Sequence, residues 1–189
     1  MTEMSGSASI PTPLILTETG WLRHSPRHIH ATIVDYLTGQ LDALGWTSGT
    51  PPFGATQVRI QTYMPPESEL TKVTSGLLAI TLGDEFDALE EEMGGPLHSQ
   101  ELPFFVDIFQ EKSAHALALA TDVRDALRGR LPAAKRVLNV QDHAQDPPSD
   151  VPGWRFEFTD VEREQIYRLP IYWQTVRCTA WVEFPEEVW

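Results

Sequence analysis

Three histidines near the beginning of the sequence, His24, His28 and His30, have a type and spacing that could bind a metal ion. A zinc site commonly takes two histidines together with a carboxylate. Residues four apart share one face of a helix and residues two apart do not, so only His24 and His28 could converge. Pro26 lies between them and is typical of a first helical turn. We therefore expect no metal site and interpret these histidines as solvated or interface residues.

The sequence contains no complete arrangement for nucleophilic catalysis. Serine, histidine and aspartate all occur, but there is no Gly-x-Ser-x-Gly elbow to present a serine. Cys178 follows the alternation of an apolar strand face, which indicates a small buried residue rather than a reactive thiol. Gly94-Gly95 is followed by Pro96, and no Gly-x-x-x-x-Gly-Lys phosphate loop is present. We expect no catalytic residue, no cofactor and no nucleotide site.

Asp107 lies inside the most apolar short run of the sequence, residues 104–109. A buried carboxylate is costly unless it is paired. Strand alternation places Asp107 on the same face as Phe105 and Phe109. We expect a structural pairing with an arginine, because a catalytic general base would need a second titratable partner that the sequence does not indicate.

A strongly acidic segment occupies residues 84–95, which contain no basic residue. It lacks the alternating Asp and Asn with a central Gly that mark a calcium loop. Mutual repulsion favours a solvated loop that projects from the domain. The alternative is an electrostatic surface that meets a basic partner or lines a passage through which DNA slides without adhering. The acidic residues are Asp84, Glu85, Asp87, Glu90, Glu91 and Glu92.

Two segments have the periodicity of amphipathic helices. The first begins at Ser25-Pro26 and ends at Gly45, with apolar residues at Ile29, Ile33, Leu37, Leu41 and Leu44. The second is capped by Ser113 and closed by Gly129, with an apolar stripe of Ala116, Leu119, Val123 and Leu127. Residues 1–22, rich in Ser, Thr and Pro, are expected to form a flexible arm that precedes one domain at 23–189.

Alternating or continuous apolar patterns predict strands, bounded by Pro- and Gly-rich turns. The fold class expected is α+β: a mostly antiparallel sheet of about five to six strands packed with two main helices, in a single domain. Residues 104–109 form a central strand, and residues 142–153 a loop. The strands lie at 57–64, 77–82, 104–109, 136–141, 154–159 and 171–184.

The last predicted strand is long, since about 14 residues span roughly 46 Å. A domain of this length has a radius of gyration of only about 16 Å, so the strand would cross the domain or overhang it. Its apolar face carries Val176, Cys178, Ala180, Val182 and Phe184. The other face carries two tryptophans, and aromatic residues in such places are enriched at protein interfaces. The predicted interface residues are Trp173, Arg177, Trp181, Glu183 and the terminal Trp189.

The overall charge excludes some classes of partner. Among 189 residues, 27 are acidic and 14 are basic, for a net charge of −13. This excess disfavours tight binding to DNA or RNA. The single cysteine is typical of a reducing compartment. No signal peptide and no run of about 20 apolar residues is found, so we expect a soluble protein that does not enter a membrane.

Together with this order of elements, three segments resemble the tail terminator proteins of long-tailed siphophages, particularly those that infect actinobacteria. They are residues 102–109, 122–130 and 173–184, and the resemblance covers the chain from about residue 25 to its end. It implies a virion structural protein of the neck, assembled in the host cytoplasm as a ring, usually homohexameric. The ring caps the head-proximal end of the tail tube, stops its polymerisation and meets the head connector, while DNA passes through the lumen.

The resemblance carries over no catalytic residue. The N-terminal arm and the acidic segment exceed the layout expected of a minimal tail terminator. They leave open a neighbouring head-to-tail joining protein, such as a head-closure or connector subunit. A small cellular enzyme with an unrecognised site is the third alternative.

Overall fold

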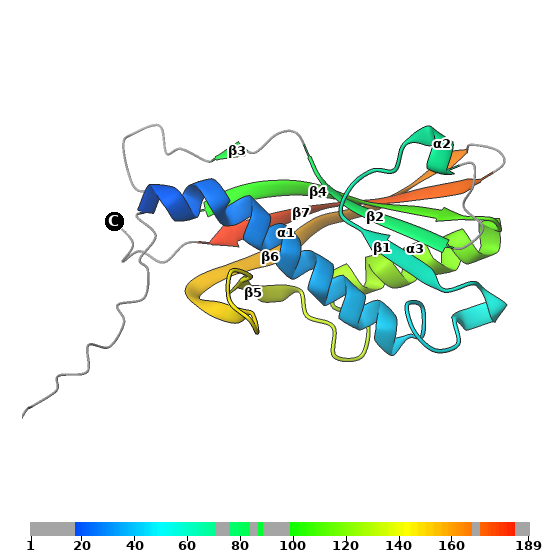
Figure 1. Cartoon of the computed structure of the whole chain (residues 1–189), viewed down its shortest axis with the longest axis horizontal. Helices are drawn as coiled ribbons and strands as arrows, with labels where there is room; N and C mark the ends of the chain where they lie inside the picture. Colours follow the sequence, from blue (N-terminus) through cyan, green and yellow to red (C-terminus); the bar gives the residue numbers. More distant parts are fainter. Residues whose placement is uncertain (1–17, 71–75, 84–86, 89–98, 168–170, 184–189) are drawn as a thin grey trace, which may run out of the picture.

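Two long helices lie against one face of a twisted β-sheet in the computed structural model (Figure 1). The structure describes residues 18–70, 76–83, 87–88, 99–167 and 171–183. The helices are α1 (Glu18–Ala43), α2 (Glu67–Leu70) and α3 (Ser113–Leu127), with a 3-10 turn η1 (Pro52–Gly54). The strands are β1 (Val58–Gln61), β2 (Gly76–Leu82), β3 (Asp87–Ala88), β4 (Ser99–Gln110), β5 (Val137–Asp142), β6 (Ser149–Tyr167) and β7 (Tyr172–Glu183).

The sheet has seven strands in the order β1-β2-β4-β7-β6-β5, and β3 pairs with β4 beside this path. Only β1 and β2 are parallel, and every other pairing is antiparallel. The α+β fold class is thus confirmed. The expected central position of the apolar strand is confirmed as well, because β4 has β2 on one side and β7 on the other.

β7 crosses the sheet and does not overhang it. Its residues pair with β4 along the whole strand, from Tyr172 opposite Gln110 to Glu183 opposite Ser99. β6 pairs with its other side from Tyr167 to Arg155. A strand flanked over its full length satisfies its backbone polar groups within the sheet. Of the two alternatives predicted from its length, crossing the domain and overhanging it, the second is therefore wrong. β7 has no unpaired edge within the described residues.

The inner face of the sheet, defined here as the face that packs against α1 and α3, is apolar. In β7 it carries Val176, Cys178, Ala180 and Val182, all buried as the alternation predicts. They join one core with the helix residues expected from the periodicity, including Ile33 of α1. Further predicted helix residues in this core are Ile29, Leu37, Leu41, Leu119, Val123 and Leu127. Apolar burial on one side of the sheet thus holds the two layers together.

The helix boundaries differ in part from those expected. α1 begins at Glu18 and has Pro26 in its interior, so it includes residues that the sequence assigned to the arm. A proline favours the first turn, but it removes only one backbone donor and did not end this helix. In α3 the N-cap is Lys112 rather than Ser113, whereas Gly129 has the left-handed φ of +64° expected at a helix end.

β6 is longer than its apolar pattern suggested and extends to both sides of it. Its beginning pairs with β5, with Ser149 opposite Asp142, so the loop expected at 142–153 is confined to residues 143–148. A bulge interrupts its pairing with β7 between Thr159 and Glu162. Asp160 in this bulge has a left-handed φ of 48°. Beyond the bulge, the only strand paired with β6 in the described part of the chain is β7.

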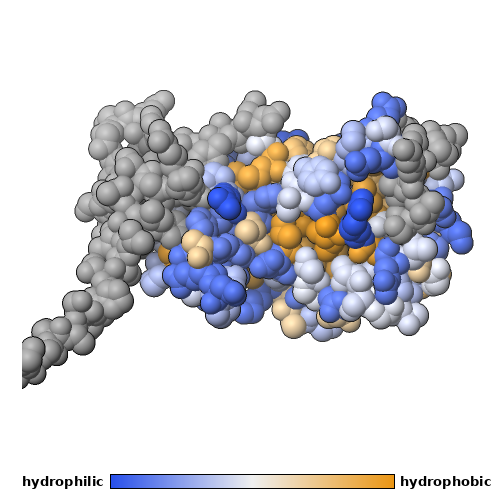
Figure 2. All heavy atoms as spheres, in the orientation of Figure 1, coloured by the Kyte–Doolittle hydropathy of each residue, from blue (hydrophilic) through white to orange (hydrophobic). Residues whose placement is uncertain are grey.

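Apolar residues reach the surface on one side of the molecule, between α1 and the β1–β2 edge (Figure 2). The half-buried Val34 and Ile60 pack on the main core. Within the described ranges, no helix is long and apolar enough to cross a membrane.

Candidate assembly surface

The outer face of the sheet, opposite α1 and α3, carries the predicted interface residues of β7. Of the helices in the described residues, only the short α2 contributes a side chain to its apolar cluster, through Leu70. The alternation predicted for β7 is confirmed. The even-numbered residues from Gln174 to Val182 are buried. On the outer face, Arg177 is exposed, and Trp173, Trp181 and Glu183 are partly exposed. The predicted Trp189 lies outside the described residues.

Asp107 lies on this outer face and is buried, but its partners are not arginines. Its Oδ1 accepts a hydrogen bond from Trp173 Nε1 at 2.8 Å and another from Thr175 Oγ1 at 2.6 Å. Thr175 stands directly opposite Asp107 in the pairing of β4 with β7. The expected pairing with an arginine is therefore wrong, because two neutral donors of the adjacent strand satisfy the carboxylate.

Trp173 is held in a small apolar cluster at one end of the outer face. Its ring centroid lies 5.3 Å from that of Phe109, at an interplanar angle of 40°. Leu70, Leu77 and Ala79 complete the cluster, and Ile171 packs against it. Local packing thus accounts for this tryptophan, which sequence reasoning had assigned to an interface.

Trp181 lies at the other end of the outer face, between two acidic residues. Glu101 of β4 and Glu157 of β6 stand opposite it on either side. Glu183 is engaged by Arg155, whose Nε lies 2.5 Å from its Oε2. Trp181 is half-buried, and no rings packed against it are found among the described residues. This leaves Trp181 and the exposed Arg177 as the predicted interface residues without a structural role of their own.

Acidic residues outnumber basic ones on the outer face. Strand register gives this face three described basic residues, Arg59, Arg155 and Arg177. Its acidic residues on β4, β6 and β7 are Glu101, Asp107, Glu157, Glu162, Glu164 and Glu183. Such a surface repels phosphates and attracts basic partners.

The acidic segment predicted to project from the domain lies mostly outside the described residues. Asp87 is described, and it pairs with Glu101 of β4 as part of β3. At this position the expected loop is a short strand. Asp84, Glu85, Glu90, Glu91 and Glu92 are not described by the structure.

Two of the three histidines considered as metal ligands, His28 and His30, have hydrogen-bond partners elsewhere in the fold. His28 is buried, and its Nδ1 accepts a hydrogen bond from the backbone N–H of His143 at 3.2 Å. His30 Nε2 lies 2.9 Å from the carbonyl oxygen of Ile80. The side chain of His24 lies outside the described residues. His28 therefore belongs to the interior, in contrast to the solvated or interface position expected, and within the described residues no cluster suited to a metal ion is found.

Cys178 is buried at the inner face of β7, as expected. Burial raises the pKa of its thiol well above the ordinary value, and the Asp160 carboxylate raises it further. Hydrogen bonds to the carbonyl oxygens of Thr179 and Thr159 oppose the shift only in part. A thiol held in its neutral form is a poor nucleophile and a poor metal ligand.

Sequence reasoning missed a basic groove at the end of α3. A cavity of about 350 Å³ lies between Arg128, Arg130 and Arg136 on one side and residues 158–162 of β6 on the other. The signal available was the concentration of basic residues at 124–136 in an acidic chain. The bulge in β6 between Thr159 and Glu162, which forms the other side of the groove, could not be predicted from the alternation of apolar and polar residues.

No protein-family model matches this sequence, and neither does any curated protein. Among solved structures, the chain is similar to a chain from the virion of a native gene transfer agent particle. The two are 16% identical, with a TM-score of 0.40, and the match covers 78% of this chain and 91% of the other. A likeness at this level carries no argument about function.

Proposed function

We propose that this chain is a structural virion protein, the tail terminator of a long-tailed phage. It forms a ring, a homohexamer by its resemblance to that family, that caps the head-proximal end of the tail tube. The ring stops tube polymerisation and joins the tail to the head connector. The proposal rests on the resemblance of residues 102–109, 122–130 and 173–184 and on the form of the sheet.

The observation that carries the proposal is the outer face of the sheet, which neither α1 nor α3 covers. This face presents the half-buried Trp181 and the exposed Arg177, four residues apart along β7. A surface that combines aromatic residues with arginine is typical of interfaces between proteins. The partners proposed for this chain are further copies of itself, the tube protein and the connector protein.

The two ends of the sheet favour head-to-tail contacts. β1 ends the sheet on one side, while β5 and the second half of β6 end it on the other. Because these ends are unlike, copies joined through them make heterologous contacts, which close into rings when the rotation permits. The acidic excess of the whole chain, with a net charge of −13, would let DNA pass through the lumen without adhering.

The test measures assembly and tube binding separately. Size-exclusion chromatography with light scattering gives the mass of the assembly, and electron microscopy of purified tail tubes shows whether the protein caps one end. We expect Trp181→Ala to weaken both by at least about tenfold, as for an aromatic interface residue. Leu117→Ala, which removes a side chain that is 44% exposed on α3 and away from the outer face, is the control and should change neither. A protein that ignores tubes but binds filled heads would be a head-closure or connector subunit instead.

A further inference from the structure

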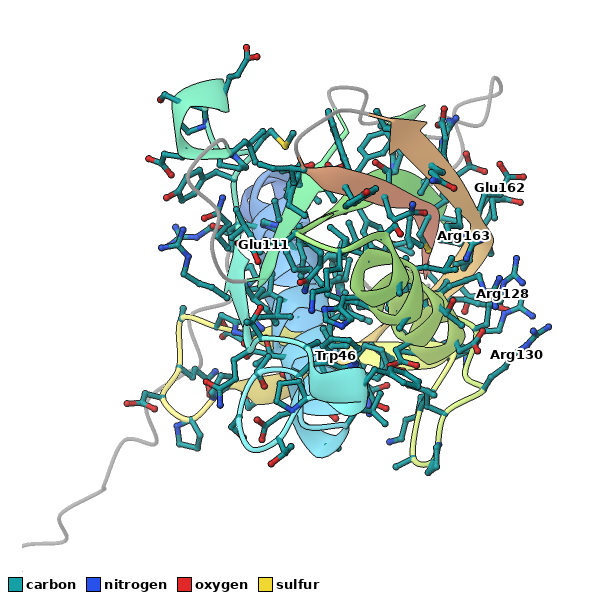
Figure 3. The ribbon with its side chains drawn as sticks, turned by 90° about the vertical axis from the view of Figure 1, so that its right-hand side faces the viewer. Trp46, Glu111, Arg128, Arg130, Glu162 and Arg163 are labelled. Carbon is teal, nitrogen blue, oxygen red and sulfur yellow. The ribbon has the colours of Figure 1, made fainter. Side chains whose placement is uncertain are left out.

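Basic residues are concentrated at the end of α3. Five of the 14 lysines and arginines lie at 124–136, together with a single acid, Asp125. In a view along α3, Arg128, Arg130 and Arg163 extend toward the same side of the molecule (Figure 3). In a chain of net charge −13, this is a local reversal of charge.

Two arginines of the groove are positioned by acceptors on β6. Arg128 donates to the carbonyl oxygen of Val161 in the bulge. Arg136 Nε lies 2.8 Å from the carboxylate of Glu157 and 3.2 Å from the carbonyl oxygen of Phe158. A guanidinium group has five donors in a fixed plane, so these contacts hold each side chain and leave donors for a ligand.

Two further arginine side chains are available for an anion: Arg130, which lines the groove, and Arg163 beside it. Both residues are exposed, and neither side chain has an ion-pair or hydrogen-bond partner within the described part of the chain. Arg163 stands opposite Val176 in the pairing of β6 with β7, which places it on the same face as α3.

Three acids also lie at the groove. Asp160 and Glu162 line the cavity, and Glu157 forms an ion pair with Arg136. With Arg163 beside the cavity, four arginines face these three acids, so only a small excess of positive charge remains.

The form of the groove suits carboxylates of an extended peptide. Planar guanidinium groups bind carboxylates through two parallel hydrogen bonds. The groove lies beside the part of β6 that has a single strand neighbour in the described residues, so a chain can approach it lengthwise. Nucleic acid is disfavoured, because four arginines on a chain of net charge −13 offer little attraction for a polyanion.

The sequence contains a complementary occupant. Residues 84–92 carry six acids and no base. The described part of this segment, β3, pairs with β4, and two strands, β4 and β7, separate it from β6. Three strand spacings of about 4.8 Å hold Asp87 roughly 14 Å from the β6 of its own chain.

We propose that the groove at the end of α3 binds the acidic segment 84–92 of a second copy of this chain, through Arg128, Arg130 and Arg163. This contact rests on the proposed ring function and specifies how neighbouring copies join, because it pairs unlike surfaces of the two copies. It gives a chain of large negative charge a way to associate with itself, since each contact brings the basic region of one copy against the acidic segment of the next.

Charge reversal tests the contact by sedimentation velocity on the full chain. We expect Arg130→Glu with Arg163→Glu to weaken self-association at least about tenfold, and Glu90→Lys with Glu91→Lys to do the same. An equimolar mixture of the two variants should associate, because the reversed groove accepts the reversed segment. Arg27→Glu with Lys112→Glu changes the net charge equally on exposed residues away from the groove, since Lys112 lies at the opposite end of α3, and should leave association unchanged.

A synthetic peptide of residues 83–95 should compete with assembly, and its amide analogue, with Asn and Gln in place of the acids, should not. Each of four results would overturn the contact: a wild-type chain that stays monomeric, groove variants that associate normally, a mixture that fails to associate, or a DNA duplex that competes better than the peptide.

Tube binding separates this contact from the proposed function. If the chain caps tail tubes and the ring still forms with Arg130→Glu and Arg163→Glu, the groove contact is wrong and the proposed function stands. If the mixture of the two variants associates but the chain does not bind tail tubes, the contact is supported and the tail terminator role is wrong.

Discussion

The indole of Trp173 donates a hydrogen bond of 2.8 Å to the carboxylate of Asp107, across neighbouring strands of the sheet. The same carboxylate oxygen accepts a second bond from Thr175. The sequence patterns predicted a buried carboxylate at Asp107 and an interface residue at Trp173 independently of each other. In the structure the two side chains form one hydrogen-bonded unit. The acceptor belongs to β4 and both donors to β7, so the unit links the two strands on the outer face.

Replacing Asp107 should destabilise the fold. Asp107→Ala leaves the Trp173 and Thr175 donors without their acceptor in a buried position, at a cost of about 1–3 kcal/mol. Asp107→Asn retains one side-chain oxygen as an acceptor and should lose less. Urea unfolding followed by tryptophan fluorescence measures both. Equal losses for the two variants would show that the acceptor is not what matters.

The carboxyl of Asp122 should make stability depend on pH. Burial raises its pKa, while the hydrogen bond from Trp46 Nε1, at 2.7 Å, opposes the shift and the Asp125 charge adds to it. Because the folded-state pKa lies above the unfolded value near 3.8, the contribution of this group is complete below that pH. It is lost as the pH rises through the folded-state pKa.

Asp122→Asn removes this titration and keeps an acceptor for Trp46. The unfolding free energy of the wild-type chain, minus that of the variant, should therefore fall as the pH rises from about 3 to about 7. Urea titrations at several pH values measure the difference. Gln165→Asn, at an exposed position without a titratable group, is the control and should give no such trend. A difference that rises with pH would contradict the assignment.

The thiol of Cys178 should react only when the chain unfolds. Its pKa is raised by burial and by the Asp160 carboxylate, so almost no thiolate is present near neutral pH. We expect labelling by a disulfide reagent at pH 8 to be at least about a hundredfold slower than for a free thiol, and to become rapid in denaturant. Fast labelling of the folded chain would show that β7 opens or that the thiol is accessible.

The bulge of β6 should be sensitive to the residue at position 160. Asp160 has a left-handed φ of 48°, which a β-branched side chain tolerates poorly. Asp160→Val should cost about 1–2 kcal/mol of stability, whereas Asp160→Gly should cost little or nothing. Thermal unfolding of the two variants compares them. If Val and Gly are tolerated equally, the backbone at this position is not held in that conformation.

The sequence alone determined the fold class, the two main helices and the faces that they bury. Residues Ile29 to Leu41 recur at helical spacing, and Val176 to Val182 alternate, because these periods follow from local backbone geometry. The same local rules misplaced the start of α1, because a proline favours the first turn of a helix but does not prevent the helix from beginning earlier. They also missed the first residues of β6, whose pairing with β5 requires no apolar pattern.

The tertiary structure decided what depends on residues far apart in the chain. It placed β7 between β4 and β6, gave Asp107 its partners Trp173 and Thr175, and brought the arginines after α3 against the bulge of β6. Local periodicity cannot select among these pairings, because strand order and register follow from the packing of the whole chain. For that reason the candidate surface could be predicted as one face of a strand, while the role of each residue on it could not.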